Sequence, residues 1–97
     1  MRHFYRTTVA PDVVMESADR YFALRGQAKG RSESRSQLFT GALGVLRLSV
    51  RMDGGHYTVV EAYTDQVGES RLDKNVKQFF VVLHRQADAR RRVEAGY

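Results

Sequence analysis

Several residue types that carry common chemistry are absent or rare in this chain of 97 residues. It has no cysteine, no tryptophan and only one proline. The absence of cysteine excludes a disulfide scaffold, a thiolate nucleophile and a metal site built on sulfur. The three histidines (His3, His56 and His84) are far apart, and no two of them share a helix face at metal-binding spacing. We therefore expect no metal site and no cofactor.

Long apolar runs are also missing. No stretch approaches the roughly 20 apolar residues of a membrane-spanning helix, and residues 1–6 lack the apolar run of a signal peptide. We therefore expect a cytoplasmic protein with no membrane partner. The length suits a single domain over residues 1–97. Because a domain of this size has a small core that a second copy would help to bury, we also expect a homodimer.

Positive charge is in excess. The chain has 16 Lys and Arg against 11 Asp and Glu, a net charge of +5. That balance favours a polyanionic partner such as nucleic acid. The candidate nucleic-acid contacts lie in the basic segment 26–36 and along the last helix, and they are Arg31, Arg35, Lys77, Arg85 and Arg91. For these residues we favour an ordinary solvated basic surface over nucleic-acid binding.

The first half of the chain predicts alternating strand and helix. Residues 3–9 are aromatic and β-branched, which is typical of a strand. Pro11 suits the first turn of a helix that continues to Leu24, and Gly26 suits its end. We interpret the polar segment 26–36 as a loop, part of whose end (32–36) could already be strand, and residues 37–40 as a short strand.

Residues 43–64 predict a β-hairpin. Apolar residues alternate with Arg47, Ser49 and Arg51 at period two, and Asp53-Gly54-Gly55 turns the chain. Two registers remain open, because a shift of one residue exchanges the faces of the returning strand. A two-residue loop places Glu61 on the apolar face as an acid with a raised pKa. A three-residue loop, which we favour, sets it opposite Arg47 as a cross-strand ion pair.

Residues 70–97 predict one long helix. Its apolar side chains step by three and four residues and therefore form a stripe that must lie against another surface. They are Leu72, Val76, Phe79, Phe80, Leu83 and Ala87. Ser70 or Asp73 can cap the start of this helix. Together the elements predict an α+β two-layer sandwich, β-α-β-β-β-α, with a four-stranded, mostly antiparallel sheet and both helices on one face.

Residues 4–14 (Phe-Tyr-Arg-Thr-Thr-Val-Ala-Pro-Asp-Val-Val) resemble the opening of START-related proteins, the helix-grip group that includes polyketide cyclases and lipid carriers. In that family a strand runs into a helix that begins small-Pro-x-x-Val, and a long C-terminal helix closes over a curved sheet. This chain would be a truncated member. The resemblance implies an apolar cavity between the sheet and Phe79, Phe80 and Leu83.

The order of elements is also similar to that of ribosome hibernation factors, small basic proteins with two helices on one side of a four-stranded sheet. That second resemblance is one of topology only. It implies binding to RNA and to the ribosome through basic helix faces.

From these observations we expect a small non-catalytic binding module for an apolar small molecule or a protein partner. Its candidate ligand contacts are Leu48, Val50, Tyr57, Glu61, Phe79, Phe80 and Leu83. The alternative is a basic protein associated with RNA or the ribosome. The third hypothesis is a cyclase-like enzyme with Glu61 as acid or base, for which no nucleophile or catalytic motif in the chain gives support.

Overall fold

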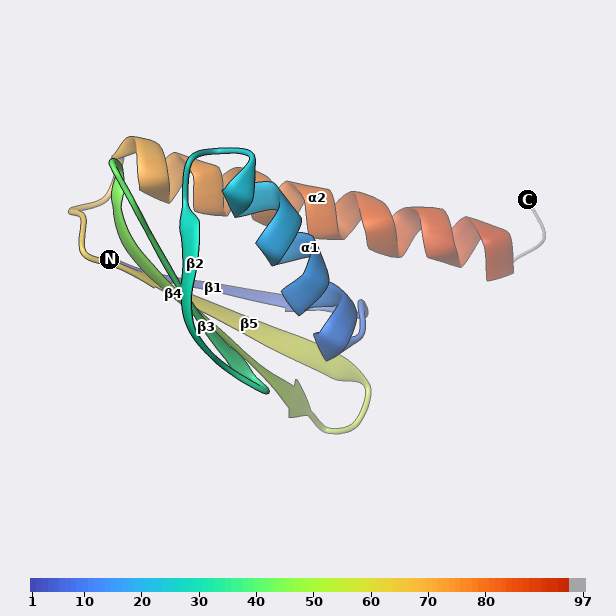
Figure 1. Cartoon of the computed structure of the whole chain (residues 1–97). Coiled ribbons are helices and arrows are strands. Elements are labelled where there is room, and N and C mark those ends of the chain that lie inside the picture. The colour runs from blue at the N-terminus through green and yellow to red at the C-terminus, as the bar shows by residue number, and fades with distance from the viewer. Residues whose placement is uncertain (95–97) are drawn as a thin grey trace.

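Five antiparallel strands form one curved sheet, and both helices lie on the same face of it (Figure 1). The structure is a computed structural model that describes the backbone of residues 1–94 and the side chains of residues 1–90. The elements in chain order are β1 (Arg2–Thr7), α1 (Pro11–Ala23), β2 (Ala28–Glu33), β3 (Ser36–Gly41), β4 (Gly44–Asp53), β5 (Tyr57–Thr64) and α2 (Arg71–Glu94). The strand order is β1-β5-β4-β3-β2, so the first strand lies beside the last.

The predicted α+β fold is confirmed, but the prediction of four strands is wrong. The additional strand is β2, which lies within the segment that we interpreted as a loop. All six of its residues are exposed, because β2 forms one edge of the sheet. A strand that buries neither face has no physical reason to alternate apolar and polar residues. The pattern by which the other strands are recognised is therefore absent from β2.

The hydrophobic core lies between the helices and the inner face of the sheet. Phe22 of α1 packs with Phe39 of β3 and Phe79 of α2 at ring-centroid distances of 5.3 and 5.4 Å. All three rings are fully buried, as are Leu46 and Leu48 of β4. The aromatic side chains thus fill the space between the two layers. Burial of side chains of this size contributes roughly 1.5–3 kcal/mol each.

A buried polar cluster holds the start of α2 against the sheet. Ser70 caps the helix, since its Oγ accepts a hydrogen bond from the N–H of Asp73 at 3.0 Å. The Asp73 carboxylate in turn accepts hydrogen bonds from the hydroxyls of Ser70 (2.6 Å) and Thr64 (2.8 Å), and it lies 2.7 Å from Nε2 of His3. The cluster therefore links α2 to both β5 and β1.

The electrostatics of Asp73 follow from these contacts. Its side chain is completely buried. Burial alone would raise the pKa of this carboxyl, but the hydrogen bonds from His3, Ser70 and Thr64 outweigh burial and lower the pKa from 3.8 to about 2.

Within the described part of the chain, neither α1 nor α2 is both long and apolar enough to cross a membrane.

Candidate functional site

The loop of the β4–β5 hairpin decides which side chains of β5 face the solvent. Asp53 pairs with Tyr57, so the loop has three residues, and its Gly54 and Gly55 have the positive φ angles (65° and 77°) that glycine adopts without strain. In this register Val60 and Ala62 join the core, and Glu61 lies on the opposite face.

The prediction that Glu61 lies opposite Arg47 is wrong. Glu61 pairs with Ser49, whereas Arg47 pairs with Tyr63. Glu61 instead lies 3.4 Å from a guanidinium nitrogen of Arg2 and 3.8 Å from one of Arg51. It is thus an ion-paired surface residue with other partners than the one predicted.

We call the side of the sheet away from the helices the outer face. The pairing of the strands arranges its residues in rungs that run across the sheet. One rung is Arg2, Tyr63, Arg47 and Leu38; the next is Phe4, Glu61, Ser49 and Ser36; the third is Arg6, Val59 and Arg51. Arginines and aromatic residues therefore share a surface that no described helix covers (Figure 1).

The arginines lie over the apolar and aromatic members of these rungs. The guanidinium carbons of Arg47 and Arg2 are 5.0 and 6.0 Å from the ring centroid of Tyr63, and that of Arg6 is 5.4 Å from Tyr57. Such cation–π contacts contribute about 0.5–1 kcal/mol each at exposed sites. Val59 is only 1% exposed although it belongs to this face. Its neighbours across the sheet are Arg6 and Arg51, and long arginine side chains commonly cover apolar surface with their aliphatic stems.

Glu61 is held as a carboxylate on this face. The phenol of Tyr63 donates a hydrogen bond of 2.5 Å to it, and this bond, with help from Arg2 and Arg51, lowers the pKa of Glu61. The same hydrogen bond raises the pKa of Tyr63. A lowered pKa is opposite to the raised pKa that a general acid on an apolar face would need.

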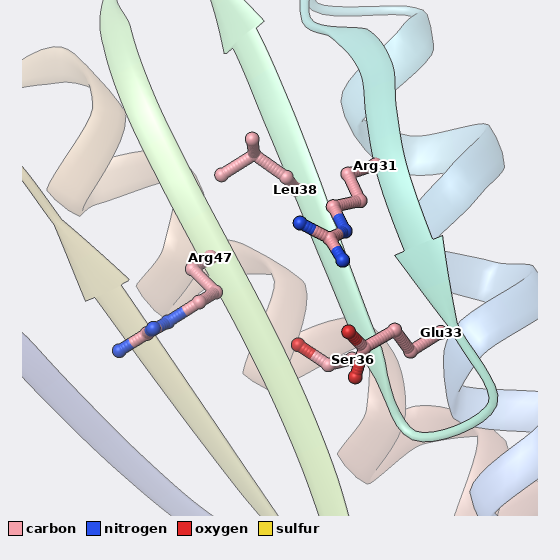
Figure 2. Close-up of a pocket in the computed structure, with 5 residues that line it drawn as sticks. All are labelled: Arg31, Glu33, Ser36, Leu38 and Arg47. Carbon is pink, nitrogen blue, oxygen red and sulfur yellow. The ribbon is translucent and has the colours of Figure 1, made fainter.

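A hollow of about 400 Å³ lies at one side of the outer face, over β2, β3 and β4. Arg31, Glu33, Ser36, Leu38 and Arg47 line it. Figure 2 shows that the Arg31 guanidinium reaches over β3 near Leu38, while the Glu33 carboxylate lies beside Ser36. Among the described residues, no carboxylate forms an ion pair with Arg31 or Arg47, and no cation pairs with Glu33. The hollow therefore offers charged groups whose hydrogen-bonding capacity is free for a ligand.

A second open hollow, of about 480 Å³, lies where the end of α1, the β3–β4 turn and the start of α2 meet. Arg25 and Arg71 line it together with Asn75 and Leu43. Arg25 is already engaged, because its guanidinium lies 3.5 Å from the ring centroid of Tyr21 and donates a hydrogen bond to the Tyr21 carbonyl. The second hollow combines segments that are distant along the chain, whereas the first is formed by three consecutive strands, of which β2 carries no strand pattern.

The residues proposed for an apolar ligand do not form one site. Leu48, Val50, Phe79 and Leu83 are buried in the core. Phe80 is partly buried and stacks on Tyr5 at a centroid distance of 5.0 Å. Tyr57 and Glu61 lie on the outer face, on the other side of the sheet.

The residues proposed for nucleic acid are also divided. Arg31 lines the hollow on the outer face, and Arg35 is exposed in the turn between β2 and β3. Lys77 and Arg85 lie on α2, where Lys77 is 3.6 Å from Glu69. The side chain of Arg91 lies outside the described residues. Arg2 and Arg6 were missed, because β1 joins the outer face only through tertiary pairing, whereas the period-two pattern places Arg51 beside Arg47.

In the part of the chain whose side chains are described, no three His, Asp or Glu residues gather closely enough to hold a metal ion. No protein-family model, curated protein or solved structure matches this chain.

Proposed function

We propose that this chain is a non-catalytic binding module and that its outer face binds single-stranded nucleic acid. The observation that carries the proposal is the interleaving of arginines with aromatic side chains on an uncovered sheet. Single-strand binders combine a basic surface, which follows the phosphates, with aromatic rings, on which bases stack. Both elements are present in adjacent rungs of the same face.

The side chains available for these two tasks can be identified. Phe4 and Tyr57 are 52% and 43% exposed, so each has ring surface for a base to cover. Arg47 lines the hollow and has no carboxylate partner among the described residues, so it is free to contact a phosphate. Five arginines on this face (Arg2, Arg6, Arg31, Arg47 and Arg51) outnumber its three carboxylates (Glu33, Asp53 and Glu61).

The shape of the surface favours a single strand over a duplex. The outer face is a curved sheet, and no described helix stands out from it to enter a groove. In a duplex the bases are stacked on each other and offer aromatic residues only their edges. An unpaired strand can splay its bases onto Phe4 and Tyr57 while its phosphates meet the arginines.

The hypothesis of an apolar ligand has less support. It requires space between α2 and the sheet, where Phe22 contacts both Phe39 and Phe79 and all three rings are fully buried. The resemblance to START-related proteins stays a prediction, and the filled core argues against an apolar cavity. The homodimer stays a prediction too.

The test is fluorescence anisotropy with 12-nucleotide RNA and DNA strands of the same sequence, titrated at 50 to 300 mM salt. We expect binding whose affinity falls steeply with salt, because bound phosphates release counterions. The Arg47→Ala variant should bind several-fold more weakly at low salt and flatten the log–log slope by about 0.7, the value for one lost contact to a single strand. Tyr57→Ala should weaken binding at least fivefold through lost stacking.

Arg85→Ala is the matched control, since Arg85 is an exposed arginine on α2, in the other layer. It should leave both affinity and salt slope unchanged. If Arg85→Ala weakens binding and Arg47→Ala does not, the ligand lies on the helices and the outer face is the wrong surface. If no strand binds at 50 mM salt, nucleic acid is excluded. Equal affinity for RNA and DNA would assign binding to phosphates and bases alone, and a preference for RNA would add contacts to the 2′-hydroxyl.

A further inference from the structure

The hollow on the outer face holds a guanidinium and a carboxylate that are not paired with each other, whereas Asp53 and Glu61 on the rest of this face are paired with arginines. At one side Arg31 presents a guanidinium, which only donates hydrogen bonds, and at the other Glu33 presents a carboxylate, which only accepts them. Although the two residues line the same hollow, no ion pair joins them. Figure 2 shows that the guanidinium extends over β3 and that the carboxylate turns toward Ser36. The donor and the acceptor are thus side by side without neutralising each other.

The floor and the size of the hollow suit one nucleotide. Leu38 provides apolar surface on β3, and the volume of about 400 Å³ is in the range of small-molecule sites. Arg47 lines the hollow on the side that faces Tyr63, so a strand leaving the hollow would continue onto the first rung. A base that occupies the hollow has to place hydrogen-bond acceptors against Arg31 and hydrogen-bond donors against Glu33.

Guanine is the base that satisfies this requirement. It presents two adjacent N–H donors, at N1 and N2, to the two oxygens of a carboxylate, and two acceptors, O6 and N7, to a guanidinium. Adenine and cytosine each place a ring-nitrogen acceptor beside their amino donor, and uracil flanks its single N–H with two carbonyls. Each of these three bases would therefore turn at least one acceptor toward Glu33.

We propose that the hollow formed by Arg31, Glu33, Ser36, Leu38 and Arg47 selects guanine in a single-stranded nucleic acid. Glu33 accepts hydrogen bonds from N1–H and N2–H of the base, Arg31 donates to O6 and N7, and the base plane rests on Leu38. This inference depends on the proposed function, because it assigns base selection to one part of the same surface.

The probes are three 12-nucleotide RNA strands: U12, the same strand with one central guanosine, and the same strand with inosine in its place. We expect wild-type protein to bind the guanosine strand about tenfold more tightly than U12, as a bidentate base contact provides. Inosine lacks the N2 amino group and should recover only about threefold. The Glu33→Gln variant should bind all three strands within a factor of about two, while its affinity for U12 stays at or slightly above that of the wild type.

Glu16→Gln on α1 is the matched control, because Glu16 is an exposed glutamate on the helical layer. It should keep the full preference for guanosine. Glu33 is exposed on an edge strand, so its replacement does not threaten the fold. Salt-dependent binding of U12 with no preference for guanosine, or a preference that survives Glu33→Gln, would overturn this inference and leave the proposed function standing. Failure of all three strands to bind would overturn both.

Discussion

The two faces of the β4–β5 hairpin are made by alternate residues of the same strands, yet different interactions stabilise them. On the inner face, Leu46, Leu48 and Val60 are buried under the two helices. On the outer face, Arg47 and Tyr63 from the same two strands meet across the sheet and stay in contact with solvent. The inner face is stabilised by exclusion of water, and the outer face is organised by charge and by cation–π contacts.

This difference predicts which positions of the sheet tolerate substitution. The inner face is packed, so an altered side chain leaves a void or a clash. Most side chains of the outer face are exposed and can be replaced without loss of core packing. Val59, which is buried, is the exception. A surface free of structural demands is available to bind a partner, and the following three changes test that division in order of expected effect.

The largest effect should come from the core aromatic ring. Phe79→Ala should lower the free energy of unfolding by about 3–5 kcal/mol, because it leaves a cavity beside Phe22. The matched change on the outer face, Tyr57→Ala, should cost under about 1 kcal/mol, since the ring is already half exposed. Urea unfolding monitored by circular dichroism measures both, and a similar cost for the two would abolish the distinction between the faces.

The second effect concerns the buried cluster at the start of α2 and is visible in the pH dependence. The pKa of Asp73 is lower in the folded state (about 2) than in the unfolded chain (3.8), so its ionised form stabilises the fold above about pH 4. That contribution, about 2 kcal/mol, is lost as the pH falls through about 2. Asp73→Asn should therefore unfold more easily at pH 7 but lose less stability between pH 4 and pH 2 than the wild type.

Asp53→Asn is the control for this pH dependence, because Asp53 forms an exposed ion pair with Arg6 on the outer face. Its acid unfolding curve should follow the wild type within about 0.5 kcal/mol. An unchanged slope in Asp73→Asn would mean that the carboxylate is not held as the structure has it.

The smallest effect should come from Glu61. Glu61→Gln removes the carboxylate that accepts the hydrogen bond of Tyr63, so the raised pKa of Tyr63 should fall toward its ordinary value of 10. Tyrosinate absorbance during an alkaline titration, compared with that of Tyr63→Phe, measures this shift. Stability should change little, and affinity for the RNA strand should rise about twofold because a negative charge leaves the outer face. A raised pKa of Tyr63 that persists in the variant would contradict the hydrogen bond.

Much of the fold follows from local pattern. Pro11 begins α1 as predicted, and Ser70, one of the two predicted caps, caps α2. The prediction failed for β2, whose exposed edge position removes the alternation that marks a strand. The candidate site was predictable only in part: Arg31 was among the proposed residues, but Glu33, Leu38 and Ser36 carry no signal without their neighbours in space.

The amino-acid sequence by itself determined the type of most elements and the identity of the core, because burial of apolar side chains imposes a period of two on strands and three to four on helices. It did not determine which strands lie side by side. Those pairings depend on many cross-strand contacts worth roughly 0.2–1 kcal/mol each, which no single segment encodes. The tertiary structure alone placed β1 beside β5 and β2 beyond β3, and thereby assembled the rungs of the outer face and the hollow between Arg31 and Glu33.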